Sequence, residues 1–208
     1  MPPAPGGKPF NTAYYAQLIG SARARYEEKV RMCDGVDPYT LRPGTDTTTD
    51  INALPEVTHG DIVNYLVYSS SFVTLQEMKA FKSLEAHNYF TSGWVKSLSS
   101  KRLQQGKVLL LGEVNHSLRL GDGPLKVWVL CMADGSVLTA HCTCMAGVGE
   151  ACSHIGACLF AVDTGVRMRN DKTCTGKDNA WLPTYVEKVQ FKRLKDIDFT
   201  SSREKNSF

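Results

Sequence analysis

The sequence predicts an α+β fold, in which a helical N-terminal half packs on a small antiparallel sheet. Apolar side chains recur at helical spacing in the first hundred residues, whereas the segment from residue 107 to residue 141 alternates in the manner of strands and contains a hairpin turn. The chain has 208 residues, of which 42% are hydrophobic, and this suits one folded domain with an appendage.

The N-terminal part is predicted to form a helix followed by a long loop. Residues 1–10 are rich in proline and glycine and are expected to be a disordered leader. Asn11 is a candidate cap for a helix that runs to about Met32. One stripe of this helix carries Leu18, Ile19, Ala22, Tyr26 and Val30. Residues 34–55 are expected to form a long loop, and a loop of this length is unusual inside a compact domain. Residues 11–55 are therefore expected to be an arm that packs onto the body or a partner.

Residues 56–106 are predicted to be a helical segment. A short helix is expected at residues 58–67, where Asp61 suits the positive N-terminal end of the helix. One or two helices are expected at residues 75–98, with a break near Asn88 or Gly93. The apolar side chains of this stretch are expected to lie in the core, and they are Met78, Phe81, Leu84 and Trp94.

Residues 107–170 are predicted to contain a three-stranded sheet that leads into a helix. Residues 107–120 alternate as one strand, and residues 124–141 read as a hairpin whose turn holds Asp134 and Gly135. After residue 153 the period changes to that of a helix, which is expected to reach residue 168. Its apolar stripe consists of Ile155, Leu159, Val162 and Val166.

Four residues between the hairpin and this helix have the chemistry of metal ligands. Cys142, Cys144, Cys152 and His154 supply three thiols and one imidazole, which is the full complement of a closed tetrahedral zinc site. Zinc favours soft thiolate and imidazole donors, and four protein ligands leave no position for a substrate water. The pattern therefore predicts one structural Zn²⁺ per chain.

The expected local structure brings these ligands together. Alternate residues of an extended chain share a face, so Cys142 and Cys144 point the same way and Thr143 points away. Residues two apart in a helix differ by about 200°, so Cys152 can approach the metal only if it precedes the first regular turn. The expectation is a ββα unit clasped by one ion. The free nitrogen of His154 is expected to donate to a carboxylate or a backbone carbonyl, and Glu150 is the nearest acid.

Other cysteine and histidine residues are interpreted as structural. His141 adjoins Cys142, but its strand phase points it to the opposite face. Cys158 shares a helical face with His154 and is expected in the core. The seven cysteines are an odd number and residues 1–8 have no signal-peptide pattern, so disulfides are disfavoured and a reducing, intracellular setting is expected.

The ligand pattern also carries a family resemblance. Cys-Thr-Cys followed by Cys-Ser-His resembles the CxCxₙCxH signature of the SWIM-type zinc finger. Residues 82–95, 145–157 and 196–200 resemble a group of animal proteins in which such a finger precedes a YqaJ-type viral-recombinase exonuclease domain, and the wider similarity spans residues 61–208. The Asp/Glu-x-Lys nuclease core of that domain is not recognisable. The resemblance implies a nuclear (or cytoplasmic) DNA-binding module of a mobile-element-derived or recombination-type protein.

The charge distribution suggests where nucleic acid would bind. The net charge is only +3, but residues 77–107 carry six Lys or Arg against two acids, and residues 167–208, which include the basic C-terminal extension at 171–208, carry ten against six. The residues expected to contact phosphates are Arg167, Arg169, Lys172, Lys192, Arg193, Lys195, Lys101 and Arg102. A solvated basic face is the alternative, and cations also suit the C-terminal end of a helix.

Several function classes have no support in the sequence. It contains no Walker loop, GxGxxG, GxSxG or HExxH motif, and no catalytic constellation, so the chain is expected not to be an enzyme and to have no small-molecule substrate. No apolar run reaches the ~18 residues of a membrane-spanning helix, so no membrane partner is expected. A protein-interaction module, or the front part of a nuclease whose catalytic domain is absent from this chain, remain the alternatives to DNA binding.

Overall fold

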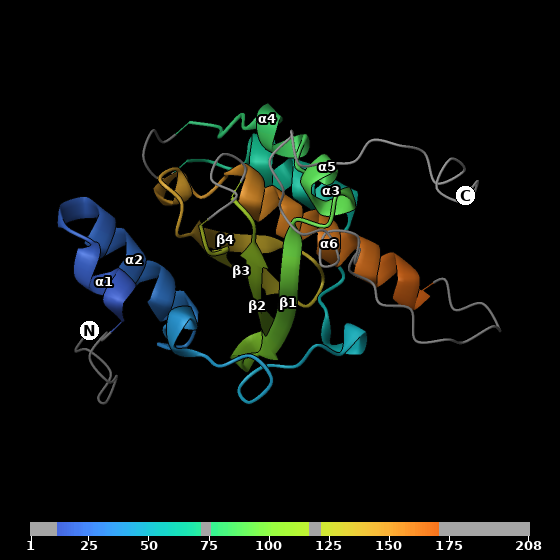
Figure 1. Cartoon of the computed structure of the whole chain (residues 1–208), viewed down its shortest axis with the longest axis horizontal. Coiled ribbons are helices and arrows are strands. Elements are labelled where there is room, and N and C mark those ends of the chain that lie inside the picture. Colours follow the sequence, from blue (N-terminus) through green and yellow to red (C-terminus); the bar gives the residue numbers. More distant parts are fainter. Residues whose placement is uncertain (1–11, 72–75, 117–121, 171–208) are drawn as a thin grey trace, which may run out of the picture.

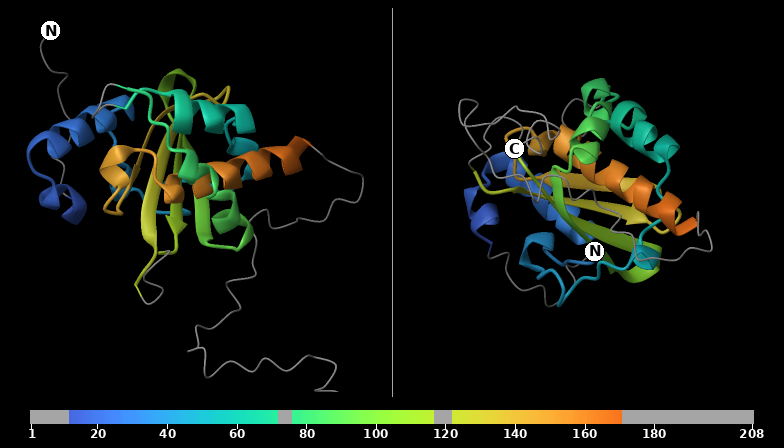
Figure 2. Two further views of the ribbon diagram at one scale, coloured as in Figure 1. Left: turned by 90° about the horizontal axis from the view of Figure 1, so that it is seen from above. Right: turned by 45° about the vertical axis from the view of Figure 1, so that its right-hand side comes forward.

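The computed structural model describes residues 12–71, 76–116 and 122–170, and it has the α+β class that the sequence predicts. A four-stranded antiparallel sheet, with strand order β1-β2-β3-β4, lies at the centre of the molecule (Figure 1). Its strands are β1 (Val95–Arg102), β2 (Lys107–Val114), β3 (Leu125–Met132) and β4 (Val137–Cys142). One set of helices covers each face of this sheet (Figure 2).

The predicted hairpin is confirmed, and the sheet is one strand larger than predicted. Strands β3 and β4 pair on either side of the Asp134–Gly135 turn, where Gly135 has a φ of +102° that suits glycine. Strand β1 arises from residues that were expected to be helical or irregular, and it pairs along its length with β2. The sequence of β1 lacks the alternation of apolar and polar residues that usually marks a strand, because two of its buried residues, Ser99 and Ser100, are polar.

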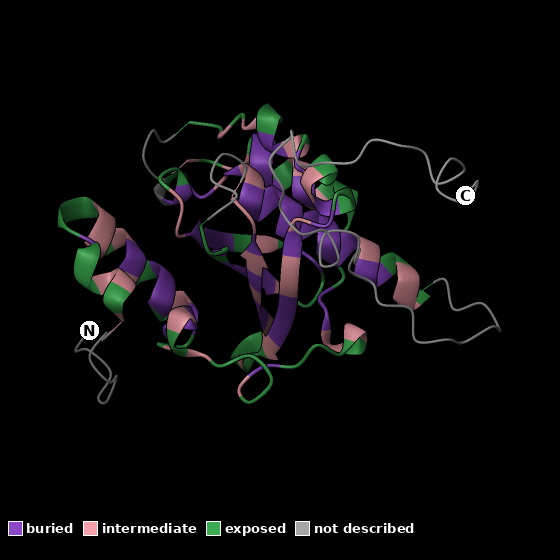
Figure 3. Ribbon diagram, viewed as in Figure 1, coloured by how far each residue is buried: buried purple, intermediate pink, exposed green. Residues whose placement is uncertain are grey.

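Short helices and one long helix cover the first face of the sheet, which we call the α6 face. They are α3 (His59–Val63), the π-helical turn η3 (Asn64–Tyr68), α4 (Phe81–Leu84), α5 (His87–Thr91) and α6 (Ser153–Asn170). The large apolar core lies between these helices and the sheet, and the ribbon of α6 is buried over much of its length (Figure 3). Helix α6 confirms the predicted helix at residues 153–168.

Details of this helical layer differ from the predictions. The helix α3 begins with a capping box between Thr58 and Asp61, as the acid near its N-terminus indicated. Helices α4 and α5 are separated at Glu85 and Ala86, close to the predicted break at Asn88, and α5 ends at Thr91, before Gly93. The expectation for Phe81 was wrong, because 60% of its surface is exposed. The other three apolar side chains of this stretch pack against the core.

Two N-terminal helices cover the second face, which we call the α2 face. They are α1 (Ala13–Gln17) and α2 (Gly20–Met32), so the single predicted helix is divided. Thr12 caps α1, whereas the predicted cap Asn11 lies outside the described residues, and Gly20 has a φ of +54° at the break. Tyr26 and Val30 of the predicted stripe are buried against β2 and β3, whereas Ile19 beside the break is 79% exposed. The N-terminal arm therefore packs onto the body of the domain.

The predicted loop after α2 crosses to the other edge of the sheet. It contains only the 3₁₀ turns η1 (Pro38–Thr40) and η2 (Ile51–Ala53) and a short bridge, in which Thr48 and Ser100 exchange backbone hydrogen bonds of 2.8 Å. Among the described residues, no helix combines the length and the apolar character needed to span a membrane.

Candidate metal centre

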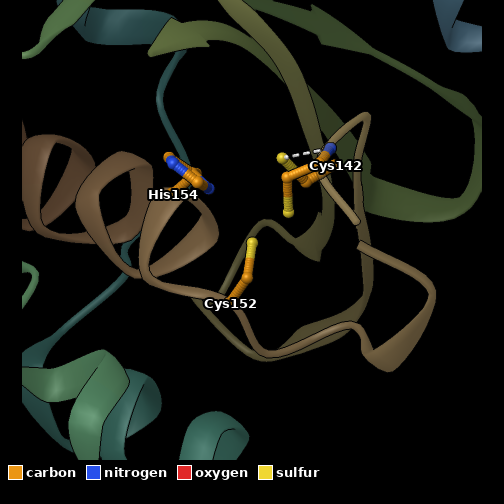
Figure 4. Close-up of side chains that lie close together, drawn as sticks. Cys142, Cys152 and His154 are labelled. Carbon is orange, nitrogen blue, oxygen red and sulfur yellow. Dashed lines mark hydrogen bonds between the residues drawn. The ribbon is translucent and has the colours of Figure 1, made fainter. Parts of the chain in front are cut away.

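The four predicted ligands meet at one corner of the sheet. Cys142 is the last residue of β4, Cys144 follows it, Cys152 directly precedes α6, and His154 lies in the first turn of α6. One potential ligand atom from each residue lies within 4.8 Å of all the others. Figure 4 shows the side chains of Cys142, Cys152 and His154 directed towards a common space.

Hydrogen bonds hold Cys142 and Cys144, at the end of β4 and just after it, on the same side. The backbone N–H of Cys144 donates to Sγ of Cys142 at 3.4 Å (Figure 4). Thr143 turns towards β3, where its N–H donates to the carbonyl of Lys126 at 3.0 Å and its hydroxyl accepts from the N–H of Lys126 at 3.0 Å. This is the alternation that the sequence predicted. The turn is so tight that a Cβ on Gly147 would lie 1.7 Å from the carbonyl oxygen of Cys142.

The start of α6 places the other two ligands. The carbonyl of Cys152 accepts the N–H of Gly156 at 3.1 Å, so Cys152 stands at the N-terminal boundary of the helix rather than within its regular turns. Helix α6 can enter this corner because Gly156 lets it approach α4, where a Cβ would lie 2.5 Å from the carbonyl oxygen of Ser83. The positive N-terminal end of α6 also favours thiolates beside it.

The electrostatics of the corner fit a bound cation. His154 is 9% exposed, and neither of its ring nitrogens has a hydrogen-bond partner among the described residues. Such buried, unsatisfied polar atoms are rare in proteins and indicate a missing partner, such as an ion. The neighbouring thiols of Cys142 and then Cys152 lower the pKa of the Cys144 thiol, so the cluster favours a thiolate. The residues present are therefore compatible with one metal ion.

The expected partner of the His154 ring was wrong, because among the described residues no backbone carbonyl accepts from it and neither does Glu150. The Glu150 carboxylate turns to the α2 face, where it accepts from Nε of Arg25 at 2.7 Å and from the hydroxyl of Thr139 at 3.0 Å. The ring of His116 lies edge-on to that of His154, with the two ring centroids 6.4 Å apart. Nothing in the sequence marks His116, because it follows β2 and is distant from the ligands along the chain.

The remaining histidine and cysteine candidates stay outside the cluster, as predicted. His141 faces α1 and α2, from which the Tyr14 hydroxyl and Lys29 Nζ meet its two ring nitrogens. Burial, followed by the charge of Lys29, lowers the pKa of His141 to about 2. Cys158 is 1% exposed and packs in the core of the α6 face. Cys33 is also buried, and burial raises its pKa to about 12.

The basic residues proposed for phosphate contact are in contrasting environments. Arg167 is 62% exposed and pairs with Asp163, whereas Arg169 is 11% exposed and pairs with Glu56 at 2.6 Å. Lys101 Nζ donates to the carbonyl of Asp46 at 3.1 Å. The other candidates in the C-terminal extension lie outside the described residues, and they are Lys172, Lys192, Arg193 and Lys195.

The fold brings two of the basic segments onto the same turn. Arg102 at the end of β1 donates to the carbonyl of Asn52 at 3.4 Å, and Arg169 at the end of α6 donates to the carbonyls of Ile51 and Leu54 at 3.3 and 2.9 Å. The turn η2 thus joins the ends of β1 and α6, which are far apart in the sequence.

No family model, curated protein or solved structure matches the chain. The feature that says most about its chemistry is therefore the ligand cluster itself. Three thiols and one imidazole can complete a four-coordinate shell around an ion at the junction of β4 and α6.

Proposed function

We propose that this chain is a non-catalytic zinc module of the SWIM type that binds DNA. The observation that carries the proposal is the convergence of Cys142, Cys144, Cys152 and His154 within 4.8 Å. Their soft donor set is the one that zinc prefers, and their number closes a tetrahedral shell. One Zn²⁺ would join the end of β4 to the start of α6 and make a rigid ββα unit.

Metal analysis of the purified chain tests the zinc assignment. We expect about one zinc per chain, and loss of that zinc in Cys144→Ser, because a hydroxyl is a much weaker zinc donor than a thiolate. Cys158→Ala is the matched control, since this cysteine lies on α6 but outside the cluster. A folded wild-type chain without zinc, or a Cys144→Ser variant that retains it, would contradict the assignment.

Basic residues near the ends of β1 and α6 support the DNA-binding part of the proposal. Arg102 and Arg169 meet at η2, and Arg167 extends from the same end of α6 with most of its side chain in solvent. The chain continues from there into a segment with an excess of Lys and Arg. Such a surface contacts phosphates and supplies affinity that does not depend on sequence.

A salt titration of binding to duplex and single-stranded DNA tests this surface. We expect the affinity to fall steeply with salt, and the double variant Arg167→Ala/Lys172→Ala to bind more weakly with a shallower salt dependence. Arg169 is left intact because it holds η2. Arg31→Ala removes a charge that is 70% exposed on α2 and serves as the control. Equal affinity and slope for the double variant and the wild type would show that this surface is wrong.

One observation favours protein binding as the second candidate function. Met145 lies just after Cys144 in the loop of residues 143–152, which we call the ligand loop, and 98% of its surface is exposed. An apolar side chain that is fully presented next to a rigid metal corner suits contact with a protein better than contact with phosphate. If the wild-type chain binds no DNA even at low salt, this candidate replaces the first.

A further inference from the structure

Glu150 connects the ligand loop to the opposite side of the sheet. Strand β4 is an edge strand, so the loop between Cys144 and Cys152 can pass around that edge. The ligands lie on the α6 face, but the Glu150 carboxylate reaches the α2 face and accepts from Arg25 at 2.7 and 3.2 Å and from Thr139 at 3.0 Å. Figure 2 shows α2 and α6 on opposite sides of the sheet.

Helix α2 provides two cations for this carboxylate from successive turns. Arg25 binds both carboxylate oxygens, and Lys29 Nζ lies 3.2 Å from one of them. The Lys29 side chain is 1% exposed, and its ammonium also donates to the carbonyl of Ala140 at 2.9 Å. Solvent screens these contacts less than surface ion pairs, and removal of one partner would leave a buried charge without compensation.

The backbone at Glu150 is held in a conformation that its side chain does not favour. Its φ is +63°, in the left-handed region where a residue with a Cβ is disfavoured relative to glycine. The hydroxyl of Tyr65 donates to the Glu150 carbonyl at 2.9 Å, so the residue is fixed from both faces of the sheet. Glycine would suit this φ, but only a carboxylate can bind the cations of α2.

We propose that Arg25 and Glu150 are positioning residues of the metal centre. Their ion pair holds the loop between Cys144 and Cys152 in the shape that places the ligands, so docking of α2 and binding of zinc are energetically coupled. This inference rests on the proposed zinc site. Coupling between two binding events is reciprocal, so zinc also strengthens the docking of α2.

Zinc affinity, measured by competition with a chelator on the full chain, tests the first direction. We expect Arg25→Ala and Glu150→Gln each to weaken zinc binding by about tenfold, which is the usual effect of residues that orient ligands. The double variant should lose no more than the worse single variant, because the two residues share one interaction. Arg25→Lys should restore part of the loss, and Arg31→Ala on the exposed side of α2 should bind zinc as the wild type does.

The variant Glu150→Gly separates the carboxylate from the backbone conformation. Glycine adopts a φ of +63° without strain, so the loop loses only the ion pairs with Arg25 and Lys29 and the contact with Thr139. We expect weaker zinc binding despite the easier backbone. Wild-type affinity in both Arg25→Ala and Glu150→Gly would overturn the coupling while leaving the zinc site intact, whereas a wild-type chain that binds no zinc would overturn both.

Hydrogen exchange of the full chain, with and without a chelator, tests the reciprocal direction. Removal of zinc should speed amide exchange in α2 as well as in residues 143–152, while the centre of β2 stays protected. In the metal-free chain, Arg25→Ala should speed exchange of the ligand loop further. If α2 exchanges equally with and without zinc, the two elements are independent and the proposal fails.

Discussion

The two faces of the sheet are held to their helices by different forces. On the α6 face, a large cluster of aliphatic and aromatic side chains packs against α6. The four candidate metal ligands lie at the corner of this face, which we call the metal corner. On the α2 face, a smaller apolar cluster is combined with buried polar groups, among them Lys29, Asp37 and His141. Burial of apolar side chains stabilises the packing of a helix but does not fix its orientation, whereas buried hydrogen bonds require one arrangement of their donors and acceptors. The metal corner touches both faces and so depends on both.

The polar groups of the α2 face form a connected arrangement around His141. The rings of Tyr26 and Tyr14 approach the imidazole edge-on, with centroids 5.1 and 5.3 Å away. The hydroxyl of Tyr26 donates to Asp37 at 2.7 Å. Because Lys29, Asp37 and His141 each have a hydrogen-bond partner, the position of α2 is specified closely even though its apolar contact is modest.

The largest expected effect is loss of apolar packing on the α6 face. Leu159 is fully buried on α6, and Leu159→Ala should lower the free energy of unfolding by about 2–5 kcal/mol. Val30→Ala removes buried methyl groups from the α2 face and should cost only about 1.5 kcal/mol. Urea unfolding of both variants measures the difference. Equal losses would mean that the two faces contribute alike.

The buried ammonium of Lys29 should make stability depend on pH. Burial lowers its pKa to about 8, although Glu150 opposes this shift, and Arg25, His141 and Cys33 also face the group. Between pH 8 and its unfolded pKa near 10.4, the unfolded chain binds more protons than the folded one, so this lysine adds stability as the pH rises.

Comparison with Lys29→Met isolates that contribution. The wild type should gain stability relative to the variant by roughly 3 kcal/mol across the whole window, since each unit of pKa difference is worth about 1.4 kcal/mol. Urea unfolding of both proteins at several pH values between 7.5 and 10 is the measurement, with pH 7.5 as the plateau. Parallel curves for the two proteins would show that folding does not lower the pKa of Lys29.

A matched pair of glycine variants examines the metal corner between the faces. A Cβ on Gly147 would overlap the carbonyl of Cys142, whereas a Cβ on Gly149 would meet no heavy atom within 4 Å. Gly147→Ala should therefore displace the loop and cost about 1–3 kcal/mol, or roughly 10- to 100-fold in zinc affinity. Gly149→Ala should bind zinc almost normally. The same affinity in both would mean that the loop adapts freely.

The sequence reveals the metal corner better than it reveals the faces. The ligands lie close together along the chain and are flanked by a strand and a helix with clear periods, so local rules suffice to bring Cys142 and His154 together. The pair of Arg25 and Glu150 spans 125 residues, and no local pattern indicates such a contact. Strand β1 is missed for a related reason. Its serines are buried because β1 pairs with β2 and contacts the distant loop, where Thr47 donates to Ser99, and no local pattern indicates these contacts.

The smallest expected effect concerns the end of α6, where two arginines look equivalent in the sequence. Arg167 is largely in solvent and pairs with Asp163 four residues earlier, so Arg167→Ala should cost only about 0.3–0.5 kcal/mol of stability. Arg169 bonds the carbonyls of Ile51 and Leu54, so its removal should cost more, about 1–3 kcal/mol, because those groups lose a charged donor.

Thermal or urea unfolding of the two single variants, followed by DNA binding at matched temperature, separates these roles. If Arg167→Ala keeps its stability and loses DNA affinity, that loss reports a phosphate contact and not unfolding. If Arg169→Ala weakens both, the effect follows from release of η2 and is no evidence of contact with DNA. Equal stability of the two variants would contradict the anchoring role of Arg169, and it would make both arginines available to a partner.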